Sequence, residues 1–232
     1  MRALLSRAPG GPETLELSDL PDPVAGPGQI VIAVKACAIN FPDVLIIEDK
    51  YQFKPERPFA PGGEIAGEIV ELGEGVTGWA VGDRVIAMLG HGGLAEKVVA
   101  TPAQLYRLPE GRSFAEGASL NLTYGTTIHA LIDRGHMKAG QTLLVLGAAG
   151  GVGLAAIELG KAFGATVVAA VSSDEKAAAA FSSDETAATT FAPNALPSSI
   201  AASPTPPAAP STSKVCPALI WPRSSSAWMV VP

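Results

Sequence analysis

The pattern of apolar and polar positions divides the chain into three zones. Short β-branched runs separated by turn residues fill the first zone, residues 1–115, and they predict the strands of an all-β barrel or sandwich. The clearest runs are QIVIAVKACAIN (29–40), EIAGEIVELG (64–73) and DRVIAML (83–89). Polar and apolar residues alternate only in part along these runs, which is typical of strands with one face in a core and the other in water.

The period changes in the second zone, residues 116–180. EGASLNLTYGTTIHALIDRG predicts a helix, TLLVLG a short buried strand, VGLAAIELGKAF a helix with one apolar face, and ATVVAAV a second buried strand. This order indicates the first half of a Rossmann domain, that is, a doubly wound parallel α/β fold.

Residues 181–232 form the third zone, in which glycine is absent and Pro, Ser and Ala dominate. This composition predicts a disordered, low-complexity tail. The strands TLLVLG and TVVAAV are apolar on both faces and belong in the middle of a sheet covered by helices. We therefore expect the Rossmann domain in this chain to be incomplete.

Composition narrows the function classes. Hydrophobic residues make up 47% of the 232 residues, and the formal net charge is -6, so the chain lacks the basic excess that a nucleic-acid partner requires. The two cysteines, Cys37 and Cys216, have no CxxC spacing, which argues against a disulfide framework or a four-cysteine zinc lobe. Because the sequence shows neither a signal-peptide pattern nor a run of about 18 apolar residues, we expect a cytoplasmic protein with no membrane partner.

A glycine-rich turn supplies the candidate chemistry. Gly147, Gly150 and Gly153 stand at i, i+3 and i+6, with Gly151 and Val152 between them, directly after a predicted strand and before a predicted helix. Such a turn lets backbone N–H groups at a helix N-terminus approach a pyrophosphate. The alternative is a tight strand-to-helix connection with no ligand.

The end of the second predicted strand decides between NAD and NADP. Ser172, Ser173 and Lys176 can donate hydrogen bonds to a 2′-phosphate, so we expect NADPH as the cofactor. The spacing of Ser172 and Glu175 also fits a capping box, in which case Ser172 only caps a helix and Lys176 is a solvated charge. Asp174 keeps NADH open, because a carboxylate there could bind a ribose 2′-hydroxyl.

Seven stretches make the chain resemble the medium-chain dehydrogenase/reductase superfamily, within it the zinc-independent NADPH:quinone oxidoreductase group. They are MRALLSRAPGGPETLEL, KACAINFPDVLIIEDKY, PFAPGGEIAGEIVELGEGV, VGDRVIAM, GGLAEKVV, LTYGTTIHAL and LGAAGGVGLAAIELGKAFGATVVAAVSSDEK. The resemblance implies a GroES-like catalytic domain at 1–115 and a partial Rossmann nucleotide-binding domain at 116–180. It stops near residue 181, from which we expect a truncated copy.

Zinc-dependent members of the superfamily carry a cysteine where this chain has Asn40 and a histidine where it has Gly63. Cys37 lies three residues too early to replace that cysteine, so we expect no metal. What remains is hydride transfer from reduced nicotinamide to a conjugated acceptor, a quinone or an enone.

The resemblance also places Asn40 and Tyr51 at the acceptor side and Thr126 next to the nicotinamide. Each has a plainer interpretation: Asn40 as a turn residue before Phe41, Tyr51 as a surface aromatic and Thr126 as a helix-start hydroxyl. Asp43 is expected to be a local hydrogen-bond acceptor rather than a general base.

Two functions stay open at this point. The first is an NADPH-dependent quinone or enone reductase, incomplete and able to form homo-oligomers. The second is an inactive remnant in which the GroES-like barrel serves at most as a binding module.

Overall fold

The structure is a computed structural model, and it describes residues 1–173, 175–177 and 228–231. It divides into two compact units, Met1–Leu122 and Thr123–Pro232. Most of the tail predicted at 181–232, and Asp174, lie outside the described residues.

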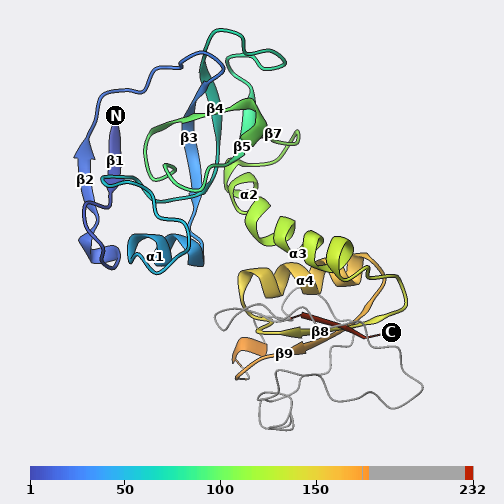
Figure 1. The fold of residues 1–232 in the computed structure, drawn as a ribbon. Helices are drawn as coiled ribbons and strands as arrows, with labels where there is room; N and C mark the ends of the chain where they lie inside the picture. The colour runs from blue at the N-terminus through green and yellow to red at the C-terminus, as the bar shows by residue number, and fades with distance from the viewer. Residues whose placement is uncertain (174, 178–227, 232) are drawn as a thin grey trace. The chain divides into compact units, whose positions relative to one another are not determined.

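The first unit is built mainly of antiparallel strands (Figure 1). Five of them form one sheet in the order β6-β3-β4-β5-β7, and two more, β1 and β2, pair separately. The strands are β1 (Arg2–Leu5), β2 (Glu16–Asp19), β3 (Ile30–Ala38), β4 (Glu64–Leu72), β5 (Arg84–Met88), β6 (Lys97–Ala100) and β7 (Leu105–Arg107). The three runs that predicted strands most clearly are thus confirmed as β3, β4 and β5.

Burial along these strands explains their pairing. The sheet encloses a core of apolar side chains from all five strands, namely Ile30, Ile32, Ile65, Ile69, Val85, Ala87, Ala100 and Leu105. Ile30 and Ile32 are two residues apart in β3, and Ile65 and Ile69 are four residues apart in β4. Because side chains alternate between the two faces of a strand, each pair lies on one face. The pairing of β3 with β4 thus fixes where the ends of these strands lie, and with them the start of the loops that follow.

Short helices complete the first unit: η1 (Pro12–Thr14), α1 (Phe41–Ile47), η2 (Pro102–Gln104) and α2 (Phe114–Ala118). Helix α1 follows β3 directly, with Asn40 as its N-cap and Asp43 completing a capping box. The helix begins here because Asn40 has extended backbone angles, φ -118° and ψ 159°, and Pro42 suits a first helical turn.

The second unit contains the predicted strand–helix–strand order. The helical run comprises η3 (Asn121–Gly125), α3 (Thr126–Ile128) and η4 (His129–Arg134), and η3 begins in the first unit. It is followed by β8 (Thr142–Leu146), α4 (Gly151–Ala162) and β9 (Thr166–Ala170). Strands β8 and β9 pair in parallel, as expected for a Rossmann domain. Helix α4 packs on one face of this sheet, where Gly160 comes close to Leu143 and Val167.

One strand of the second unit was not expected. Trp228–Val231 form β10, which pairs antiparallel with β8, so the prediction of a tail without regular structure is wrong for these four residues. The physical reason is that β8 would otherwise present an unpaired edge, and WMVV is a short run of residue types that favour strands. The central position predicted for β8 is confirmed, since it lies between β10 and β9.

Within the described residues, none of the helices has the length and apolar character that crossing a membrane would demand.

Candidate functional site

The glycine turn between β8 and α4 is closed by its own backbone. Gly147 has a positive φ of 67°, and the Gly150 amide donates to the Gly147 carbonyl at 3.0 Å. The first hydrogen bond within α4 runs from Leu154 N to Gly150 O at 2.8 Å. The amides of Gly151, Val152 and Gly153 therefore precede the intrahelical ladder, as the first amides of any helix do. They are the groups that an anion at this helix N-terminus would meet.

Gly153 allows α4 to start close to the turn. A Cβ atom at this position would lie 2.4 Å from the Gly147 carbonyl oxygen and 2.8 Å from Ala148 Cα. Backbone atoms cannot yield at such distances, so only glycine fits. Gly151 has no such constraint, since a Cβ there would meet only the Thr123 methyl group at 3.2 Å.

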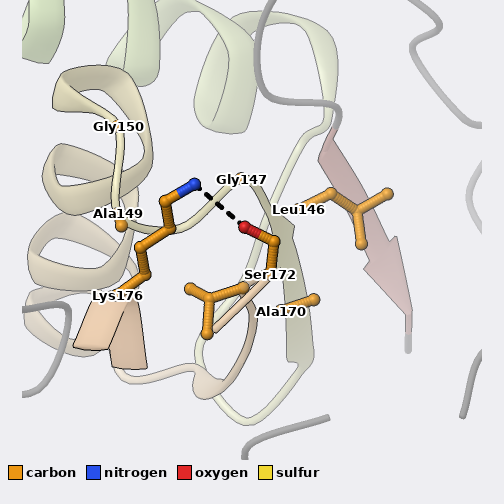
Figure 2. A pocket seen from close by; sticks show the side chains of 8 residues that line it. Leu146, Gly147, Ala149, Gly150, Ala170, Ser172 and Lys176 are labelled. Carbon is orange, nitrogen blue, oxygen red and sulfur yellow. Dashed lines mark hydrogen bonds between the residues drawn. The ribbon is translucent and has the colours of Figure 1, made fainter. Parts of the chain in front are cut away.

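A cavity of about 490 Å³ opens beside this turn (Figure 2). The described residues that line it come from the ends of β8 and β9, from the turn and from the segment after β9: Leu146, Gly147, Ala149, Gly150, Ala170, Val171, Ser172 and Lys176. Its walls are largely apolar, and its polar side chains sit together at one place. There the Lys176 ammonium donates to Ser172 Oγ at 2.9 Å.

Ser172 and Ser173 have different roles in the structure. Lys176 N donates to Ser173 Oγ at 3.3 Å, so Ser173 caps the short helical turn at residues 175–177. The predicted capping box of Ser172 with Glu175 is thus wrong, because the Ser172 hydroxyl instead faces the Lys176 ammonium. Both Ser172 and Lys176 line the cavity, where a ligand could reach them.

In the helical run before β8, the side chain of Thr127, not that of Thr126, contacts α4. Thr126 is exposed, whereas Thr127 is completely buried. Thr127 Oγ1 lies 2.8 Å from the Thr123 carbonyl and 3.3 Å from that of Val152 in the first turn of α4. Sequence reasoning missed Thr127, because nothing in two adjacent threonines on one helix shows which of them turns inward.

Tyr124 makes a second link to α4. Its hydroxyl donates a short hydrogen bond to the Glu158 carboxylate, which together with burial raises the pKa of Tyr124 to about 12. Tyr124 therefore stays protonated at neutral pH and holds η3 against α4.

At the predicted acceptor side, Asn40 is held between two carboxylates. Its backbone amide donates to Asp43 Oδ2 at 2.8 Å, and its side-chain amide donates to Glu64 Oε2 at 3.0 Å. The other Asp43 oxygen accepts from the amides of Gly62 and Gly63 at 3.2 and 3.1 Å. Burial raises the pKa of Asp43 against the effect of these hydrogen bonds. Asp43 is thus the local acceptor that the sequence predicted.

Tyr51 lies half-buried beside α1. It packs against the buried cluster of Ile46, Ile47 and Phe59. Phe59 in turn meets the edge of the His91 ring at 5.7 Å, and Phe53 stacks on that ring at 5.9 Å. Tyr51 and Asn40 therefore lie at opposite ends of α1, each fixed by different neighbours.

The side chains near Asn40 do not resemble a zinc site. Burial, and the charges of Asp43 and Glu64, raise the pKa of Cys37 to about 12, so its thiol stays protonated at neutral pH. In the part of the chain that the structure describes, no three His, Cys, Asp or Glu side chains converge as metal ligands would. His129, far from this region in the sequence, pairs with Asp133 at 2.9 Å on an exposed helix face.

Known proteins match both units. Residues 26–110 match the alcohol dehydrogenase GroES-like domain. The chain is 45% identical over 147 residues to a quinone oxidoreductase-like protein 2 homolog from Nematostella vectensis, covering 62% of this chain and 40% of the relative. It is 39% identical over 177 residues to the quinone oxidoreductase of Pongo abelii, covering 75% of this chain and 54% of that protein.

A solved structure extends the likeness to the fold. The quinone oxidoreductase from Thermus thermophilus, whose structures include its complex with NADPH, superposes with a TM-score of 0.67 at 36% identity. The match covers 76% of this chain and 55% of the Thermus chain. The chain thus spans about half the length of the relatives that it matches. The GroES-like domain, the parallel strands around the glycine turn and these relatives show that the chain belongs to the medium-chain dehydrogenase/reductase superfamily, in its quinone oxidoreductase-like group.

Proposed function

We propose that the chain binds NADPH and transfers hydride from it to a quinone or an enone without zinc. The observation that carries this proposal is the cavity beside the glycine turn, where helix amides, a close-packed glycine and the Ser172–Lys176 pair lie together.

The residues present fit a phosphorylated dinucleotide. The amides of Gly151, Val152 and Gly153 would bind the diphosphate, and the apolar walls of the cavity would hold the adenine and ribose. Lys176 and Ser172 would bind the 2′-phosphate, because an ammonium with a hydroxyl beside it suits a phosphate group better than a ribose hydroxyl. When bound, NADPH supplies the hydride and the chemistry belongs to the nicotinamide. The Thermus relative binds NADPH, which supports this choice over NADH.

On the acceptor side, Asn40 would donate a side-chain N–H to the oxygen of the quinone or enone. That oxygen gains negative charge as the acceptor is reduced, and an oriented donor stabilises it by about 2.7–4 kcal/mol in well-studied oxyanion sites. Tyr51 would provide an aromatic surface beside α1, and Thr126 would contact the nicotinamide. Asp43 has no proton-transfer role here, because its oxygens already accept three backbone amides.

We propose metal independence because of the residues at the two positions where zinc-dependent relatives carry their ligands. An amide at Asn40 and no side chain at Gly63 leave no thiolate or imidazole for zinc, and conjugated acceptors need no Lewis acid. A location in the cytoplasm and self-association stay predictions from the sequence.

Titration of the full chain with NADPH tests the proposal. The fluorescence of the reduced nicotinamide should change on binding, with saturation in the micromolar range. A mixture with 1,4-naphthoquinone should then oxidise NADPH, at a rate that dialysis against a chelator leaves unchanged. No fluorescence change up to millimolar NADPH would exclude the reductase.

The second candidate is a binding module without reductase activity, and it rests on the first unit, Met1–Leu122, which is a compact body with its own apolar core. It predicts a folded first unit together with NADPH binding that yields no quinone turnover, or no NADPH binding at all. Circular dichroism and the same titration distinguish the two candidates.

A further inference from the structure

Glu64 is a buried carboxylate to which no role has yet been given. It stands at the start of β4, its side chain is 1% exposed, and it is among the largest fully buried side chains of the described chain. A charge in such a place is costly unless it is fully hydrogen-bonded. The hydrogen-bond partners of Glu64 therefore indicate its role.

Both partners of Glu64 are hydrogen-bond donors. Oε2 accepts from Asn40 Nδ2 at 3.0 Å, and Oε1 accepts from the backbone amide of Leu122 at 3.0 Å. A carboxylate can satisfy two donors, whereas a glutamine in the same place has one oxygen and an NH₂ group that would face the second donor. Residue 64 therefore needs a hydrogen-bond acceptor at both ends of its side-chain group, which a carboxylate provides.

This arrangement fixes the direction of the Asn40 amide. Because a carboxylate only accepts, the Asn40 side chain must present its nitrogen, not its oxygen, to Glu64. The capping box with Asp43 holds the Asn40 backbone at the same time. One N–H of the Asn40 amide is bound to Glu64, and the other keeps a defined direction and is free of that bond.

We propose that Glu64 is a positioning residue, which holds the Asn40 amide so that its second N–H is aimed at the oxygen of the acceptor. The proposal rests on the proposed function and deepens it, since a fixed donor stabilises developing charge better than one that rotates. Glu64 itself would not touch the acceptor. Its effect on the acceptor would pass through the Asn40 amide.

The test compares the wild-type chain with the variant Glu64→Gln. E64Q should shift the side-chain amide signal of Asn40 in a ¹H–¹⁵N spectrum, because the nitrogen loses its carboxylate partner. It should lower kcat with 1,4-naphthoquinone about tenfold, which corresponds to about 1.4 kcal/mol of barrier, and it should leave the KM for NADPH unchanged. The described residues around the NADPH cavity all belong to the second unit, away from this substitution in the sequence.

Glu68→Gln is the matched control. Glu68 lies on the same strand, is 41% exposed and pairs with Lys35 at 3.6 Å, so E68Q makes the same chemical change without touching Asn40. Both the Asn40 signal and kcat should stay as in the wild type.

The double variant N40D/E64Q separates positioning from structure. The amide introduced at position 64 would donate its NH₂ group to the carboxylate introduced at position 40, while its oxygen accepts from Leu122. The melting temperature of the double variant should therefore lie closer to the wild-type value than that of E64Q. Turnover should stay low, because a carboxylate at position 40 has no N–H to offer the acceptor.

Two results would overturn the proposal: an Asn40 amide signal that E64Q leaves in place, or a kcat of E64Q within twofold of the wild type. Failure of the proposed function looks different, because the wild-type chain itself would then bind no NADPH or reduce no quinone. The Asn40 signal would in that case still report whether Glu64 orients the amide.

Discussion

Lys176 alone carries a positive charge among the described residues that line the cavity. Its ammonium already faces Ser172 Oγ at 2.9 Å, so a 2′-phosphate could join this pair without a large rearrangement. Charge-assisted hydrogen bonds contribute about 1.5–3 kcal/mol, and the lower end applies to an exposed lysine. We therefore predict that Lys176→Ala raises the Kd for NADPH about tenfold and leaves the Kd for NADH within twofold, as measured by fluorescence titration.

Lys161→Ala is the control for this substitution. Lys161 stands in the last turn of α4 and does not line the cavity, but its removal changes the net charge by the same amount. K161A should bind both cofactors like the wild type. Equal losses of NADPH and NADH binding in K176A would contradict a contact with the 2′-phosphate.

His91 links the stability of the first unit to pH. Its ring lies against those of Phe53 and Phe59, and burial lowers its pKa from 6.5. Protonation therefore costs more in the folded state than in the unfolded chain, so the unfolded chain binds more protons below pH 6.5. Stability should fall as the pH drops from 6.5 through the lower pKa of the folded state.

His91→Phe should remove this part of the pH dependence, since a phenyl ring keeps the aromatic contacts but does not titrate. Urea unfolding at pH 7.5 and at pH 5.5 gives the free energy of unfolding at each pH. The decrease from pH 7.5 to pH 5.5 should be smaller in H91F than in the wild type. A loss as large in H91F would assign the pH dependence to other groups.

Single residues mark the limit of what the sequence could predict. The sequence predicted the glycine turn before α4 and Asp43 as a local acceptor, because the turn and the bond from the Asn40 amide both join residues that are close in the chain. It did not predict the contacts of Thr127 and Glu64. Their partners, Val152 and Asn40, lie 25 and 24 residues away, and only the packing of two elements brings them together.

The start of α4 offers a comparison within one helix. At Gly153 a Cβ would lie 2.4 Å from a carbonyl oxygen, and at Gly151 it would meet only a methyl group at 3.2 Å. Gly153→Ala should therefore destabilise the second unit by about 1–3 kcal/mol through overpacking. Gly151→Ala should change stability by less than about 1 kcal/mol, because alanine favours a helix over glycine by up to that amount.

Urea unfolding of the two variants, followed by the circular dichroism of α4 and its neighbours, makes the measurement. G153A should also weaken NADPH binding, since the turn that is proposed to hold the diphosphate would have to move. If G151A were as unstable as G153A, the close approach of α4 to the turn would not be the cause.

Elements were predictable where their pattern was local. The strands β3, β4, β5, β8 and β9 and helix α4 all follow from apolar runs bounded by turn residues. Strand β10 did not follow, because its place is set by the free edge of β8, more than 80 residues earlier in the chain.

The two units of the chain should respond differently to cofactor. The described cavity residues all lie between Leu146 and Lys176, so NADPH bound there as proposed would stabilise the folded state of the second unit by mass action. At a free concentration of about 100 times the Kd, this linkage adds about 2.7 kcal/mol to the free energy of unfolding. The core strands β3 to β5 of the first unit have no described residue in the cavity.

Hydrogen exchange followed by mass spectrometry can read both units in one experiment on the intact chain. With saturating NADPH, amides of β8, β9 and α4 that exchange only by unfolding of the second unit should slow about 100-fold, the factor that corresponds to about 2.7 kcal/mol. Amides of β3, β4 and β5 should slow far less. NADH at the same concentration should give a smaller effect on the second unit, because Lys176 then has no phosphate to bind. Equal slowing of both sets of strands by NADPH would contradict this prediction, because it would mean that the two units unfold as one cooperative body.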